Sequence, residues 1–216
     1  MKENRLTTKK LVIIAMFGAL SGILMHFNFP IPLMPPFLKF DLGELPALLG
    51  AFLMGPAAGC LIIAVKILIK LFLGGSETLL VGELANLIGS LSYVLPAAWI
   101  YRKITTKKGA VLGMTVATFF TAASSVLGNA YLMIPMYANV FGMQIEDIVA
   151  MCQTVNPYIT GYWGVLLIGI VPFNLVKYGA TSGVTFILYK RVSRLFKSMN
   201  IEMLPEKERS KKVQAE

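Results

Sequence analysis

Histidine, cysteine and charged residues are all scarce in this 216-residue chain. Its only histidine is His26, and its two cysteines, Cys60 and Cys152, are far apart in or beside apolar stretches. Without a CxxC pair or a second histidine, the sequence indicates neither a disulfide framework nor a metal site. A lone histidine also offers no partner for acid–base catalysis.

The sequence also lacks the motifs of common enzymes. It contains no GxxxxGK[ST] loop for ATP, no HExxH and no GxSxG. We therefore expect no catalytic residues and no resident cofactor. If the protein performs work that needs ATP, a separate partner must supply the ATPase.

Charged residues make up only 14% of the chain, whereas apolar residues make up 56%. Soluble domains carry about 25% charged residues, so the composition indicates an integral membrane protein. The apolar runs are long and unbroken, which favours an all-α bundle over a β-barrel. The net charge of +9 is concentrated at the ends of these runs, as expected for cytoplasmic flanks and not for a nucleic-acid partner.

Six membrane helices are predicted, at about 11–29, 44–54, 57–73, 80–101, 110–134 and 161–189. An even number places the basic clusters near residues 2–10, 102–108 and 190–197 on one side, with both termini in the cytoplasm. Residues 1–10 then form a cytoplasmic N-terminus, 11–191 the membrane domain, and 192–216 a charged tail that we expect to be partly disordered. Residues 135–160 form an outer segment.

The stretch from Pro35 to Gly59 organises this prediction. It starts as a polar loop and becomes an apolar helix that Gly55-Pro56 ends after about ten residues, too few for a full crossing. Four prolines stiffen the loop at 30–43, and its apolar residues suggest a lid or pocket wall. We interpret the stretch as one wall of a small-molecule site near the outer face.

Two lysines share one face of the predicted helix at 57–73. Charges inside a membrane helix are costly and face an interior, a partner or the interface. Lys66 is the deeper of the two and should have an internal partner. Lys70 lies near the outer end and can snorkel to the interface.

Polar residues gather in the outer halves of the predicted helices and in the first outer loop. Such groups either satisfy one another or bind a polar solute, and a cluster of this size favours a shared site. The candidates are Lys39, Asp41, Glu44, Lys66, Glu83, Asn86, Asn129, Asn174 and Lys177.

Asn174 and Lys177 lie one turn apart after Pro172, which frees a backbone carbonyl. Together they suit a heterocycle with adjacent donors and acceptors, such as a uracil-like edge. Nearby aromatic residues could stack on a planar ring or could form an ordinary interfacial belt. They are Phe37, Phe40, Tyr131, Tyr137, Tyr158, Tyr162 and Trp163.

The first helix carries two overlapping small-xxx-small patterns, Ala15 to Ala19 and Gly18 to Gly22. Small residues one turn apart allow another helix to approach closely. The pattern fits internal packing and a docking face for a second protein equally well.

Several stretches resemble the substrate-binding S components of energy-coupling factor (ECF) vitamin transporters, especially their riboflavin-specific, RibU-type group. The resemblance runs from about residue 8 to 195. It is carried by FLKFDLGELPALLG at 37–50, GPAAG at 55–59, GELAN at 82–86, PFNLVK at 172–177 and LYKR at 188–191.

This resemblance implies six helices in a prokaryotic cell membrane and a vitamin, riboflavin, bound from outside. It also implies a transmembrane coupling subunit and two cytoplasmic ATPases as partners. Ala15 and Ala19 match the family's docking motif, and Asn174 and Lys177 match positions that meet the flavin ring. Asn129 and Asn139 both align with a third polar position; Asn129 is preferred because it falls within a helix. Asp41-Leu-Gly-Glu44 departs from the family's Asp-Pro-Ser-Asp-like run.

Riboflavin is the expected ligand, with Lys39, Phe40, Asp41, Glu44, Glu83, Asn86, Asn129, Asn174 and Lys177 as its expected contacts. One alternative is an S component for thiamine, folate, pantothenate or a queuosine precursor. The amide and lysine of the last helix disfavour a cationic ligand such as thiamine. A second alternative is a small membrane assembly factor.

Overall fold

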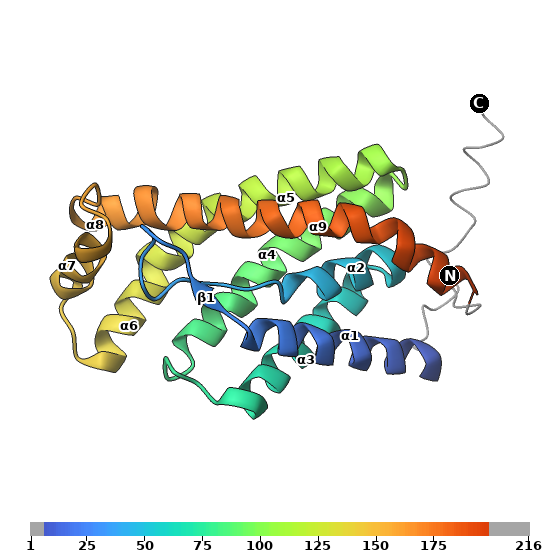
Figure 1. Cartoon of the computed structure of the whole chain (residues 1–216), viewed down its shortest axis with the longest axis horizontal. Coiled ribbons are helices and arrows are strands. Elements are labelled where there is room, and N and C mark those ends of the chain that lie inside the picture. Colours follow the sequence, from blue (N-terminus) through green and yellow to red (C-terminus); the bar gives the residue numbers. More distant parts are fainter. Residues whose placement is uncertain (1–6, 199–216) are drawn as a thin grey trace.

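The chain is an all-helical membrane protein, shown as a computed structural model in Figure 1, which describes residues 7–198. The described residues contain five helical stretches that are long and apolar enough to cross a membrane. They are Thr8–His26, Pro56–Gly74, Val81–Lys103, Lys107–Phe141 and Gly161–Tyr189. The predicted all-α membrane class is therefore confirmed.

Helix α1 (Thr8–His26) starts at Thr7, whose side chain accepts a hydrogen bond from the backbone N–H of Lys10. It ends three residues before the predicted end at residue 29. There the Asn28 amide donates to the carbonyls of Met25 and His26 and so satisfies the last turn. The chain then forms strand β1 (Phe29–Pro30), which pairs antiparallel with β2 (Lys39–Phe40).

The short helix α2 (Glu44–Met54) and helix α3 (Pro56–Gly74) confirm the predicted break at Gly55-Pro56. Gly55 has φ of 103°, a conformation that residues with a Cβ rarely adopt. Pro56 then starts α3, where its missing N–H costs nothing. At 11 residues, α2 is about 16 Å long, roughly half the hydrocarbon thickness, and all of it is buried.

The second half of the chain contains two long helical stretches, each with a π-helical turn. Helix α4 (Val81–Lys103) leads to α5 (Lys107–Gly128), the π segment η1 (Asn129–Met133) and α6 (Ile134–Phe141). After α7 (Ile145–Val155), the short α8 (Gly161–Gly164) and π segment η2 (Val165–Ile170) lead into α9 (Val171–Ser198). Pro135 and Pro172 lie just after the π turns, where each lacks an N–H for the regular ladder. The predicted outer segment 135–160 thus holds most of α6 and all of α7.

The start of α1, the α4–α5 connection and the end of α9 lie at one end of the bundle, away from β1 (Figure 1). Two apolar clusters form the core. The larger cluster contains residues of each helix from α1 through α5 and of α9. The smaller cluster contains residues of η1, α6, α7 and η2. Helix α9 continues past the predicted boundary at 191 to Ser198. The tail from 199 onward and residues 1–6 lie outside the described residues.

Candidate functional site

A cavity of about 190 Å³ lies between the two core clusters. Its walls come from the loop before α2, the first turns of α4, the end of α5 with η1, and the first turns of α9. Seven of the nine predicted contacts line it: Lys39, Asp41, Glu83, Asn86, Asn129, Asn174 and Lys177. The other two, Phe40 and Glu44, do not.

The loop at 30–43 is a wall of this cavity, as predicted. Phe37, Leu38, Lys39 and Asp41 all line it. The β1–β2 pairing holds one part of the loop, and the Asn156 amide holds another by donating to the Leu33 carbonyl over 2.9 Å. These contacts fix the loop against the helices without any long strand.

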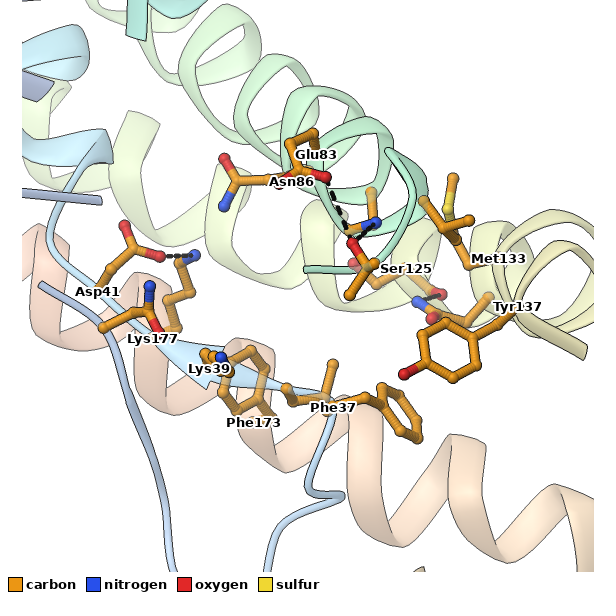
Figure 2. Close-up of a pocket in the computed structure, with 18 of the residues that line it drawn as sticks. Phe37, Lys39, Asp41, Glu83, Asn86, Ser125, Met133, Tyr137, Phe173 and Lys177 are labelled. Atoms are coloured by element: carbon orange, nitrogen blue, oxygen red, sulfur yellow. Dashed lines mark hydrogen bonds and ion pairs between the residues drawn. The ribbon is translucent and has the colours of Figure 1, made fainter. Parts of the chain in front are cut away.

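Asp41 connects this loop to α9. Its side chain is only 3% exposed and accepts hydrogen bonds from the Gly43 N–H at 2.8 Å and from Lys177 Nζ at 2.8 Å. Figure 2 shows the Lys177 side chain reaching from α9 to this carboxylate. Lys177 therefore lies at the cavity wall with its charge already compensated.

A second, fully buried ion pair lies behind the wall. Lys66 Nζ donates to Glu44 Oε1 at 3.0 Å, to Asn86 Oδ1 at 2.6 Å and to Ser90 Oγ at 2.6 Å. The internal partner predicted for Lys66 is thus confirmed. Glu44 faces this lysine instead of the cavity, and its second oxygen lies 3.6 Å from Lys177 Nζ.

Lys70 forms an ion pair with Glu83 and also donates to the Gly75 carbonyl at 3.0 Å. The sequence allowed Lys70 to snorkel to the interface; in the structure its ammonium group pairs within the protein, and the side chain is 12% exposed. The first turn of α4 brings the Glu83 carboxylate within reach of this lysine. Lys70 lines the cavity and was missed as a site residue.

Lys39 of β2 forms an ion pair with Glu77, in the turn between α3 and α4. Both side chains line the cavity and are substantially exposed, at 41% and 66%. The hydrogen bond and the positive charge of Lys39 lower the pKa of the Glu77 carboxyl below its usual range. This pair joins the loop to the α3–α4 turn over the cavity.

Three side chains from α5, η1 and α9 form a polar group on another wall. Asn129 Nδ2 donates to the Ser125 carbonyl at 2.8 Å, which leaves its amide oxygen for the cavity. Asn174 Nδ2 donates to the Ile170 carbonyl at 2.8 Å, and its oxygen accepts from Ser125 Oγ at 3.3 Å. Asn139 is exposed on α6 and does not line the cavity, whereas Asn129 does.

Two of the seven candidate aromatic residues line the cavity. The rings of Phe37 and Tyr137 lie 6.0 Å apart and, with Phe173, give the site an apolar side (Figure 2). Phe40 packs on Phe29 instead, because the pairing of β1 with β2 places these residues opposite each other. Tyr131, Tyr158 and Trp163 are 60–80% exposed, as in an interfacial belt, and Tyr162 donates to the Ala130 carbonyl.

The two small-residue patterns of α1 lie on adjacent faces of the helix, of which the glycine face is the more buried. A Cβ at Gly18 would lie 2.4 Å from Val65, and one at Gly22 would lie 2.6 Å from Ile69, so both glycines pack α1 against α3. Ala15 is exposed and Ala19 half-buried. Internal packing therefore accounts for the glycine pattern, while the alanine pattern lies on the outer face.

Each lysine that lines the cavity is paired with a carboxylate. Lys39 pairs with Glu77, Lys70 with Glu83, and Lys177 with Asp41. The site therefore has no uncompensated charge to offer an ion. With its amides, hydroxyls and aromatic side, it suits a neutral ligand that carries hydrogen-bonding groups.

The family profile described as the substrate-specific component of ECF transporters matches residues 9–189. The chain belongs to this family. It is accordingly a multi-pass membrane component of a transporter and not an enzyme.

Named relatives and a solved structure resemble this S component over most of its length. The riboflavin transporter RibU of Staphylococcus aureus (strain TCH60) is 31% identical, over 91% of this chain and 96% of that protein. The riboflavin transporter FmnP of Bacillus subtilis (strain 168) is 30% identical, over 78% and 84%. A solved S component of a bacterial ECF transporter superposes with a TM-score of 0.70 at 29% identity, over 88% of this chain and 98% of that one.

Proposed function

We propose that this S component binds riboflavin and delivers it for import. The observation that carries the proposal is the charge-compensated cavity with amides on one side and aromatic rings on the other, in a chain 31% identical to a riboflavin transporter. Riboflavin is neutral and combines a planar ring with a chain of hydroxyls. It is cargo in this proposal, and the protein needs no resident cofactor.

In this proposal Asn174 and Lys177 meet the flavin ring, and Phe37 and Tyr137 flank it. Asn86, Asn129 and the polar residues of the first loop complete the contacts. Glu44 and Phe40 act indirectly, because neither lines the cavity. Glu44 pairs with Lys66 behind the cavity wall, and Phe40 packs on Phe29. A cationic vitamin such as thiamine is disfavoured, since no carboxylate at the cavity lacks a cation.

Riboflavin enters only if the loop at 29–43 moves outward. Sites for drug-sized ligands have volumes of about 300–1,000 Å³, and this cavity is smaller as it stands. Among residues 7–198, two ion pairs tie the loop to the bundle around the opening: Lys39 to Glu77 and Asp41 to Lys177. We propose that the structure is the closed state and that these two ion pairs hold the loop closed.

We propose a topology of six helices, with α2 as a short second one, in a prokaryotic plasma membrane. The start of α1, the end of α4 and the end of α9 lie at the same end of the bundle (Figure 1), and each carries basic residues in its described part, such as Lys10, Arg102 and Arg191. The positive-inside rule then makes that end cytoplasmic. Both termini are then cytoplasmic and the cavity faces outward. A coupling subunit and two ATPases supply the energy, and the coupling subunit docks on Ala15 and Ala19.

The absorption spectrum of the detergent-purified protein tests the ligand. We expect flavin bands near about 370 and 450 nm, or saturable quenching of added riboflavin fluorescence if the protein is purified empty. Asn174→Ala and Lys177→Ala should each weaken binding while the protein still elutes as a monodisperse peak. A colourless protein that also leaves riboflavin fluorescence unchanged would contradict riboflavin as the ligand and indicate another vitamin.

Substitutions on α1 test the docking face. Ala15→Trp and Ala19→Trp should abolish uptake in cells but leave riboflavin binding to the purified protein intact, because they fill the gap that a partner helix needs. Val116→Trp is a control on the exposed face of α5. Normal uptake by both α1 variants would place the docking face elsewhere.

A further inference from the structure

The hydroxyl of Tyr178 is a buried polar group without an assigned role. The residue is only 3% exposed, yet no hydrogen-bond partner for its hydroxyl occurs anywhere in residues 7–198. Its neighbour Tyr93, whose ring lies 4.6 Å away, bonds through its own hydroxyl to Ser182 Oγ at 2.7 Å. The hydroxyl is not among the fully enclosed polar atoms that lack a partner, so it keeps accessible surface in the cavity that Tyr178 lines, where a ligand group can bond to it.

Gly89 of α4 leaves the space in front of this hydroxyl. A Cβ at Gly89 would lie 2.7 Å from Tyr178 Oη, closer than real Cβ atoms come to an oxygen. Both residues line the cavity. The hydroxyl therefore lies beside Gly89, one of two α4 glycines that line the cavity, in space that a side chain at this position would fill.

Asn86, one turn before Gly89, presents a second polar group on the same wall. Its oxygen accepts from Lys66 Nζ at 2.6 Å. An ammonium group only donates, so the amide must turn its oxygen to the lysine and its NH₂ away from it. Asn86 also lines the cavity, and no partner for this NH₂ is found in the described part of the chain.

We infer that the Tyr178 hydroxyl forms a hydrogen bond with a hydroxyl or carbonyl group of the bound ligand, beside the Asn86 NH₂. Tyr178 is thus a further ligand-binding residue, which follows the predicted contact Lys177 along α9 but faces a gap in α4. The identity of the ligand as riboflavin rests on the proposed function above.

Tyr178→Phe tests the inference with a minimal change, since it removes one oxygen and keeps the ring. We expect riboflavin affinity, measured by fluorescence quenching, to fall about 3- to 10-fold, the effect of one lost hydrogen bond. Tyr93→Phe is the matched control: it removes the neighbouring hydroxyl, which bonds inside the core and does not line the cavity. Its riboflavin affinity should match that of the wild type.

Gly89→Ala tests the same hydroxyl by a change in α4, the helix that it faces. The new methyl group would displace Tyr178 Oη, so affinity should fall by at least as much. In a Tyr178→Phe background the same methyl meets only the ring carbon, 3.9 Å away, and should cost almost nothing further. This non-additivity distinguishes a local contact from a general loss of folding.

Lumiflavin, which keeps the ring but lacks the ribityl chain, identifies the ligand group. If Tyr178→Phe lowers the affinity for riboflavin alone, the Tyr178 hydroxyl bonds to a ribityl hydroxyl. If it lowers the affinity for both flavins, the hydroxyl bonds to a ring carbonyl. Unchanged affinity of folded Tyr178→Phe for both flavins, with additive effects at Gly89, would overturn the inference alone. A wild-type protein that does not bind riboflavin would instead overturn the proposed function.

Discussion

Two groups of ion pairs hold the segment from Lys39 to Glu44 in place, and they differ mainly in burial. Glu44 and Lys66 are both 0% exposed, and Asp41 with Lys177 is nearly as buried. Lys39 and Glu77 are 41% and 66% exposed. All join the same stretch of chain to the helical bundle, but through very different surroundings.

Burial changes what removal of one partner costs. An exposed pair is solvated in both states and stabilises by about 0–1 kcal/mol. Removing one member of a buried pair leaves a charge without water or counter-ion, at a cost of about 3–5 kcal/mol. The inner pairs therefore cost more to break than the outer pair, so Lys39–Glu77 is the weaker of the two pairs proposed to hold the loop closed.

Glu44→Gln should have the largest effect. It keeps the side-chain volume but leaves Lys66 without its counter-ion, so we expect a loss of about 3 kcal/mol in the free energy of unfolding. Thermal unfolding in detergent measures this as a lower midpoint. The double variant Glu44→Leu with Lys66→Met should recover much of the loss, because it removes both charges. If the unfolding midpoint of Glu44→Gln equals that of the wild type within error, the buried pairs stabilise the protein no more than the exposed pair does.

Asp41→Asn should have an intermediate effect. Lys177 still has Glu44 3.6 Å away, so its charge is partly compensated, and we expect a loss of about 1–3 kcal/mol. The loop at 30–43 should become more sensitive to protease, and riboflavin affinity should fall. Glu146→Gln, an equivalent change on exposed α7, is the control. If both variants behave alike, Asp41 does not hold the loop.

Glu77→Gln should have the smallest effect on stability, about 0–1 kcal/mol, and this should shrink further at high salt. Lys39 lowers the pKa of the Glu77 carboxyl. The contribution of the pair is therefore fully present above the unfolded pKa, about 4.3, and is lost as pH falls through the lower folded pKa. Melting curves of wild type and variant between pH 3 and 8 should converge at the acidic end. A difference that persists there would mean that Glu77 acts through something besides this pair.

Local chain chemistry made some elements predictable. Gly55-Pro56 ends one helix and starts another because a positive φ suits glycine and a missing N–H suits a first turn. An internal partner for Lys66 was predictable as well, because a fully buried ammonium cannot remain unpaired. Seven of the nine candidate residues line one cavity for the same reason: polar groups in apolar helices gather where they can be satisfied.

Other features depend on helix packing that no local pattern encodes. Glu44 was predicted at the site but faces Lys66, since the rotation of α2 against α3 decides which way its first turn points. The sequence allowed Lys70 to snorkel, but it meets Glu83 because α3 and α4 adjoin there. Tyr178 gave no signal, as a tyrosine in an apolar helix is ordinarily a packing residue.

The sequence by itself determined the membrane class, the main helix breaks, the set of polar residues and, through its motifs, the family. Composition, backbone constraints and the high cost of unpaired charge in lipid act locally and can be read along the chain. Only the tertiary structure decided which cation met which carboxylate, which face of α1 stayed outside, and that Gly89 left room for a hydroxyl from α9. Those outcomes depend on differences of an ångström or two between helices far apart in sequence, and only their packing sets such distances.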